Sequence, residues 1–159
     1  MRENVNSHVR RVGIKDLEGR RVTLKHIPGV KECRDYQAVQ RDFPTKERIE
    51  VLHTLFQDMV TALLKMEDII WPFEQPVSEE EVPDYRDVVK DPVDLSLIQK
   101  RLDSKCYYIT EHIFFADIRR MLENCKLYNN ASTLYYQHAE SVEKALCERG
   151  WEKYFPKKK

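Results

Sequence analysis

The chain has 159 residues, of which 42% are hydrophobic and 34% charged, a composition that suits one compact globular domain. Its 27 basic and 27 acidic residues cancel, which argues against a protein that grips nucleic acid or an anionic membrane through general positive charge. Its four glycines are too widely spaced for a phosphate-binding loop, and without a membrane-length apolar run or a signal peptide we expect a soluble, non-exported chain.

The chain opens with a segment that we expect to contribute little core. Residues 1–44 mix charge with glycine and proline, and the alternating stretch 21–25 is the one candidate strand. From Thr45, apolar residues recur at helical spacing for more than four turns, and Thr45 is placed to cap that helix. We expect the helix to end before Trp71-Pro72, because proline disfavours helical geometry in the residue before it.

Three further helices are expected after a proline-rich segment, residues 71–93. They are a short helix capped by Asp94, a long one beginning after Thr110, and a last one after the polar break at 129–133. No convincing strand pattern accompanies them, so the fold class is all-α, a four-helix bundle with one long loop between the first and second helices. The inward stripes of these helices are Leu95, Ile98 and Leu102; Phe114, Ile118, Met121, Leu122 and Cys125; and Tyr135, Ala139, Val142 and Leu146.

The neutral total hides a separation of charge. Residues 67–94 hold ten acidic and two basic side chains, a net charge of −8, whereas 1–50 and 95–159 each carry +4. A run of charge usually marks a solvated loop. This segment also holds Trp71 and Phe73, and a loop of about twenty residues inside a compact domain is usually functional. If its apolar residues pack on the helices, they wall a pocket at one end of the bundle.

The cysteines give no sign of a metal centre or of disulfides. None of the four is spaced as a ligand pair, so we expect reduced thiols, no metal site and no cofactor. Cys125 together with His112 or His138, oriented by Asp117 or Glu123, contains the parts of a cysteine nucleophile site. However, Cys125 lies on an inward stripe, which favours an inert core thiol over a catalytic one.

Five motifs, in order and at matching spacing, resemble those of the bromodomain family. They are Trp71-Pro72-Phe73, Pro76-Val77, Val82-Pro83-Asp84-Tyr85, Asp91-Pro92-Val93-Asp94-Leu95 and Asn124-Cys125-Lys126-Leu127-Tyr128-Asn129. The Tyr135-Tyr136 pair is similar to bromodomains at the C-terminus of GNAT-type (SAGA-associated) histone acetyltransferases, and residues 26–30 resemble the connector that precedes them there. We therefore divide the chain into a connector segment (1–44), a bromodomain (45–155) and a basic tail (156–159).

The resemblance implies a left-handed four-helix bundle that binds acetylated lysine on histone tails. Asn129 would donate an N–H to the acetyl carbonyl, and Tyr85 would hold that carbonyl through a water molecule. The other implied contacts are a shelf of Trp71, Pro72 and Phe73, walls of Val77, Val82 and Tyr128, and a gate at Tyr135. The departures from the family pattern are Arg86 in place of a second tyrosine, Asp91, Val93 in place of methionine, and Asn130.

The resemblance also implies a nuclear, chromatin-associated protein that acts in transcription regulation as part of a histone acetyltransferase. No glycine-rich acetyl-CoA loop is present, so any catalysis belongs to a longer parent chain and this chain is a binding module. Its partners would be acetylated histone tails and, through the parent, a chromatin-modifying complex, without direct contact to nucleic acid or membrane. The acidic segment would attract such basic tails.

The chemistry of acetyl-lysine suits an apolar slot with one amide donor, because the ligand is a neutral amide on an apolar stem. Unmodified lysine would bring an ammonium into a slot without a carboxylate partner, at a cost of several kcal/mol. Structural alternatives remain. Asn129 alone is more often a helix C-cap, Tyr85 a loop anchor, and Tyr128 and Tyr135 core aromatics. A helical interaction module that binds basic partners irrespective of acetylation is the alternative function.

Overall fold

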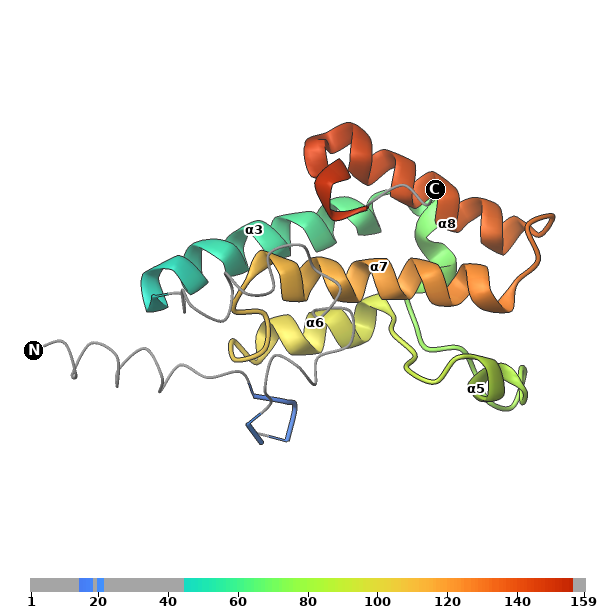
Figure 1. The fold of residues 1–159 in the computed structure, drawn as a ribbon, viewed down its shortest axis with the longest axis horizontal. Helices are drawn as coiled ribbons and strands as arrows, with labels where there is room; N and C mark the ends of the chain where they lie inside the picture. Colours follow the sequence, from blue (N-terminus) through green and yellow to red (C-terminus); the bar gives the residue numbers. More distant parts are fainter. Residues whose placement is uncertain (1–14, 19, 22–44, 156–159) are drawn as a thin grey trace, which may run out of the picture. The chain divides into compact units, whose positions relative to one another are not determined.

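The computed structural model describes residues 15–18, 20–21 and 45–155 (Figure 1). Within these ranges the secondary structure is helical apart from one isolated antiparallel bridge, between Lys15 and Arg21. The chain divides into two compact units, which are Met1–Met59 with Gln99–Ala116 and Val60–Ile98 with Asp117–Lys159. No helix in the described ranges combines the length and apolarity needed to cross a membrane.

The helices of the described residues are α3 (Lys46–Leu64), α4 (Glu67–Ile70), η2 (Trp71–Phe73), α5 (Tyr85–Val88), α6 (Leu95–Asp103), α7 (Glu111–Tyr128), α8 (Leu134–Leu146), η3 (Cys147–Trp151) and η4 (Glu152–Tyr154). Four of them, α3, α6, α7 and α8, begin at the residues that the sequence predicts, and the other five, which are short, were not predicted. The Thr45 hydroxyl accepts the Arg48 N–H at 3.2 Å, and the Thr110 hydroxyl accepts the Ile113 N–H at 3.3 Å. Asp94 accepts the backbone N–H of Ser96 at 2.8 Å. These three caps satisfy amide groups that a helix N-terminus leaves unpaired.

The first helix ends before Trp71-Pro72, as expected, but it stops six residues earlier, at Leu64. Met66 leaves helical geometry with φ −81° and ψ 55° before α4 begins. Trp71 is itself helical, with φ −54° and ψ −32°, although Pro72 follows it. Pro72 lies in the first turn of η2, where its missing N–H costs no hydrogen bond.

The first unit has an aromatic core. Phe56 of α3 stacks on Phe114 of α7 with ring centroids 4.2 Å apart, and the fully buried Tyr108 meets both rings edge-on. The Lys15 N–H donates to the carbonyl of Cys106 at 2.8 Å, so part of the predicted connector contacts the turn between α6 and α7. Of the candidate strand 21–25 only Arg21 is described; the remaining connector and the basic tail lie outside the described residues.

The second unit buries the inward stripes of α7 and α8 almost as predicted. Ile118, Met121, Leu122 and Cys125 are buried on α7, and Ala139, Val142 and Leu146 are buried on α8. Tyr135 is the exception: it was placed on the inward stripe of α8, yet 46% of it is exposed. It lies in the first turn of α8, where its ring packs beside Trp71 instead of entering the core.

The chain reverses after α8. Gly150 has φ 93°, a left-handed conformation that glycine adopts without strain, and the following turn buries Tyr154 and Phe155. Figure 1 shows the short turn that follows α8. Arg119 Nη1 of α7 donates to the Tyr154 carbonyl at 3.4 Å. The C-terminal turn is therefore packed and hydrogen-bonded within the second unit.

Candidate functional site

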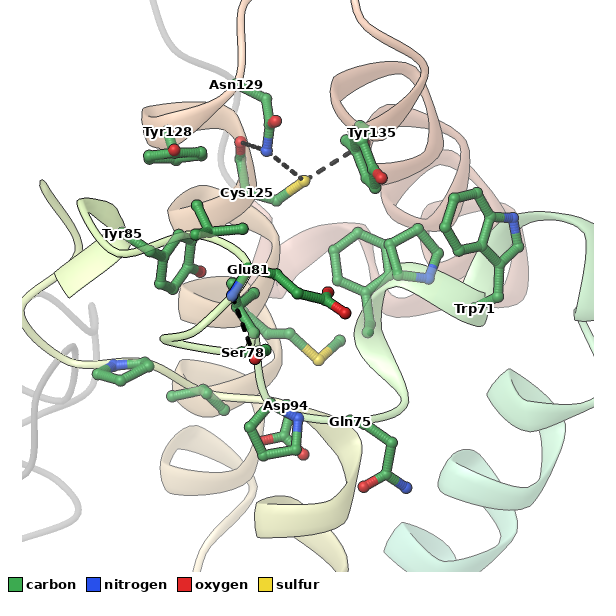
Figure 2. Close-up of a pocket in the computed structure, with 18 residues that line it drawn as sticks. Trp71, Gln75, Ser78, Glu81, Tyr85, Asp94, Cys125, Tyr128, Asn129 and Tyr135 are labelled. Carbon is green, nitrogen blue, oxygen red and sulfur yellow. Dashed lines mark hydrogen bonds between the residues drawn. The ribbon is translucent and has the colours of Figure 1, made fainter.

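A pocket of about 350 Å³ lies within the second unit, between the connection 65–94 and residues at the C-terminal end of α7 and the start of α8 (Figure 2). This volume is in the range of small-molecule sites. The structure brings all nine sequence-predicted site residues to it: Trp71, Pro72, Phe73, Val77, Val82, Tyr85, Tyr128, Asn129 and Tyr135.

Asn129 follows the last residue of α7 and is fixed there by its own helix. Its Nδ2 donates to the Cys125 carbonyl at 2.9 Å and lies 3.6 Å from the Cys125 sulfur. The side chain is thus a C-terminal cap, as the structural alternative anticipated. An amide has two N–H groups and a carbonyl oxygen, so the bond to Cys125 uses only part of its hydrogen-bonding capacity. The cap orients the amide and leaves it able to meet a ligand.

Tyr85 and Tyr128 form one side of the pocket (Figure 2). Their rings meet edge-on, with centroids 5.1 Å apart. The Tyr128 hydroxyl donates to Oδ1 of Asp84 at 2.7 Å, which ties the loop to α7. Burial raises the pKa of Tyr85, so its hydroxyl stays protonated at neutral pH and can act as donor or acceptor.

Trp71 and Tyr135 form the opposite side, and both are exposed (Figure 2). Trp71 is 45% exposed, and its ring contacts Tyr135 and His138 edge-on at centroid distances of 5.6 and 5.5 Å. Phe73, two residues further on, is buried. This arrangement gives an apolar pocket with an aromatic rim that a ligand can cover.

Cys125 lies in the lining with the properties of an inert thiol. Its Sγ donates to the Tyr135 carbonyl at 3.3 Å, and burial raises its pKa to about 11. A thiolate is the nucleophilic form, so this environment suppresses reactivity. His138, one of the suggested bases, has its ring packed against Trp71. Across the described part of the chain, no group of three His, Cys, Asp or Glu side chains is arranged to hold a metal ion.

The expectation of a slot without carboxylates was wrong, because Glu81 and Asp94 both line the pocket. Asp94 Oδ2 is engaged by the start of α6, through the N–H of Ser96 at 2.8 Å, the N–H of Leu97 at 3.3 Å and the Ser96 hydroxyl. Its charge is therefore largely satisfied within the fold. Glu81 is exposed, on the connection between α3 and α6.

The lining includes nine residues that were not predicted as site residues: Gln75, Pro76, Ser78, Glu81, Pro92, Val93, Asp94, Met121 and Cys125. Two of them, Met121 and Cys125, could have been predicted from their spacing to Asn129. Met121, Cys125 and Asn129 recur every four residues along α7, so they share one face of that helix. Asn129 at the end of this stripe predicts that Met121 and Cys125 border the same site. The loop residues had no comparable periodicity.

A model of the bromodomain family matches residues 56–141, and the chain belongs to that family. A bromodomain is a binding module, generally an acetyl-lysine reader of chromatin proteins, so the chain itself is not an enzyme. The solved bromodomain of human BAZ1A is 31% identical, with a TM-score of 0.57 over 61% of this chain and 92% of that one. Bromodomains are left-handed four-helix bundles, which confirms the predicted fold class.

Among curated proteins, the chain is similar to histone acetyltransferases and to a chromatin-remodelling subunit. It is 48% identical over 73 residues to histone acetyltransferase GCN5 of Oryza sativa subsp. japonica, covering 46% of this chain and 14% of that protein. It is 34% identical over 145 residues to GCN5 of Yarrowia lipolytica, covering 90% and 31%. Nucleosome-remodeling factor subunit NURF301 of Drosophila melanogaster is 29% identical over 142 residues, covering 89% and 5%. The chain thus spans less than a third of the length of each of these relatives.

Proposed function

We propose that this chain binds acetylated lysine on histone tails in the pocket of its second unit. The observation that supports this most directly is the juxtaposition of an oriented amide, Asn129, with the half-buried hydroxyl of Tyr85 and an apolar, aromatic lining. In this proposal the Asn129 amide donates to the acetyl carbonyl and Tyr85 holds the same oxygen through a water. The apolar stem lies between the shelf (Trp71, Pro72 and Phe73) and the walls (Val77, Val82 and Tyr128), and Tyr135 gates the entrance.

The acidic connection gives the binding a preference for basic tails. Residues 67–94 carry a net charge of −8, and Glu81 places one of these carboxylates in the lining. Exposed charges of this kind speed encounter more than they tighten the final complex. Because the contact is small, we expect dissociation constants on the order of tens to hundreds of micromolar.

The test is a titration of the chain with histone-tail peptides that differ only in acetylation of one lysine. The acetylated peptide should bind at least about tenfold tighter, since the unmodified ammonium must be desolvated near an amide donor. Equal affinity for both peptides would support the alternative, a helical interaction module that binds basic partners irrespective of acetylation.

A matched pair of variants tests the assignment of the donor. Asn129→Ala should abolish detectable binding of the acetylated peptide. Asn130→Ala should leave it within about twofold, because Asn130 is exposed, lies outside the lining, and its side chain accepts only from Ser132 in a local turn. Normal binding by Asn129→Ala would show that another group holds the carbonyl.

We further propose that residues 45–155 form the binding domain and that it belongs to a nuclear histone acetyltransferase, as in the GCN5 relatives. The higher identity to the two GCN5 proteins than to NURF301 supports this choice. Purification of the native parent protein, followed by an assay of acetyl transfer to histones, tests it. A parent that remodels nucleosomes without acetyl transfer would contradict the choice of parent but not the reader function.

A further inference from the structure

One loop residue beside the pocket is held to α7 at both its side chain and its backbone. Nη1 of Arg120 lies 3.1 Å from Oδ2 of Asp91, and Nδ2 of Asn124 donates to the Asp91 carbonyl at 2.8 Å. Arg120 and Asn124 are four residues apart and so lie on one face of α7. We call Asp91, Arg120 and Asn124 the loop clamp.

The arginine of the loop clamp is itself held in place by α7. Its Nη1 is 3.2 Å from Oδ1 of Asp117, whose side chain is fully buried, and the Arg120 side chain is only 12% exposed. Charge-assisted bonds are strengthened where water is partly excluded. Asp117 therefore fixes the guanidinium from within α7, and Asp91 meets a cation whose position is already set.

The loop clamp lies directly next to the pocket lining in the sequence. Pro92, Val93 and Asp94, which follow Asp91, all line the pocket, and Asp94 also caps α6. On α7, Cys125 directly follows Asn124, and Asn129 lies five residues after Asn124; both Cys125 and Asn129 line the pocket. The fixed φ of Pro92 couples any shift of Asp91 to the residues after it. The loop clamp thus ties α7 to the residue that precedes Pro92, Val93 and Asp94, which we call the 92–94 wall.

We propose that Asp91 and Arg120 are positioning residues for the ligand, a role that rests on the proposed acetyl-lysine binding. Neither residue lines the pocket, so neither touches the ligand. Their ion pair holds the 92–94 wall at the width that the ligand requires. Loss of the pair lets this wall move outward, which shortens the lifetime of the complex without changing how ligand and chain meet.

The experiment compares Asp91→Ala with Asp87→Ala. Asp87 is an exposed carboxylate of α5 in the same acidic connection, outside the lining, so both variants lose one negative charge but only Asp91→Ala loses the ion pair to Arg120. Stopped-flow kinetics with the acetylated peptide give the association and dissociation rates. Hydrogen exchange of the peptide fragments that contain Val93 and Asp94 reports the mobility of the wall without any ligand. Asp91→Asn removes the charge but keeps the side-chain shape, so its dissociation rate should lie between those of the unaltered chain and Asp91→Ala.

We expect Asp91→Ala to raise the dissociation rate about three- to tenfold and to speed exchange at 93–94 by a similar factor. Asp87→Ala should change both by less than about twofold, and its association rate should match that of Asp91→Ala. Equal dissociation rates and equal exchange in the two variants would overturn the proposal. If even the unaltered chain fails to bind acetylated peptide, the proposed function falls, while the exchange comparison still decides whether the loop clamp holds the wall.

Discussion

Asn129 caps a helix and is also the proposed hydrogen-bond donor to the ligand. Its amide caps α7 through the 2.9 Å bond to the Cys125 carbonyl, and it faces the pocket. Loss of this bond should cost about 0.5–1.5 kcal/mol of unfolding free energy. We therefore expect Asn129→Ala to unfold at a lower urea midpoint than the unaltered chain. A midpoint equal to that of the unaltered chain would mean that the cap contributes no stability.

His53 is a second residue whose surroundings make a measurable prediction. It is buried on α3, its Nε2 has no hydrogen-bond partner in the described structure, and burial, together with the positive charge of Lys105, lowers its pKa. The unfolded chain then takes up the proton first, so the free energy of unfolding should fall as pH drops below about 6.5, the ordinary pKa of histidine.

Urea titrations at pH 7.5, 6.5 and 5.5 measure this effect. The loss of stability between pH 7.5 and 5.5 should be smaller in His53→Gln, whatever the variant does to stability at pH 7.5. An unchanged slope in His53→Gln would assign the effect to other groups.

At the scale of elements, the turn after α8 depends on the backbone of Gly150. Its φ of 93° is costly for residues with a Cβ, although an added Cβ would meet nothing within 4 Å. Gly150→Ala should therefore lose about 1–2 kcal/mol of unfolding free energy through backbone strain alone. Gly150→Asn should lose less, since asparagine tolerates the left-handed region. Urea unfolding checks both, and an alanine variant as stable as the unaltered chain would contradict the reasoning.

The elements also mark what sequence could and could not predict of the fold. Hydroxyl and carboxylate caps at Thr45, Asp94 and Thr110 were identified from local patterns, because a cap involves residues only a few positions apart. The break at Met66 was missed, since nothing within 65–70 signals it and the apolar spacing continues. Whether Trp71 is helical depends on packing around η2, and local sequence preferences do not predict that packing.

The same distinction holds for the site. The aromatic and amide residues were predicted through a family resemblance, and the pocket gathers all nine of them. The presence of Glu81 and Asp94 in the lining depends on how a proline-rich connection folds back, and no periodic pattern encodes that path. The ion pair of the loop clamp could not be predicted from local sequence either, because Asp91 and Arg120 are 29 positions apart.

At the scale of the whole molecule, charge is neutral in sum but uneven in placement, with −8 in residues 67–94. A rise in NaCl from 50 to 500 mM should slow association of a basic acetylated peptide several-fold and leave its dissociation rate nearly constant. A neutral, single acetylated lysine with blocked ends is the control and should show little salt dependence. Equal salt responses of the two ligands would show that the acidic connection takes no part in encounter.

The exposed Trp71 gives the protein an optical signal of its own. The chain has two tryptophans, and Trp71 is 45% exposed while it contacts Tyr135 and His138 at the rim of the pocket. A peptide that covers this rim removes water from the indole, so its fluorescence emission should shift to shorter wavelength. In a Trp151→Phe background, Trp71 would be the sole tryptophan emitter. Occupancy of the pocket could then be followed in solution without an attached dye.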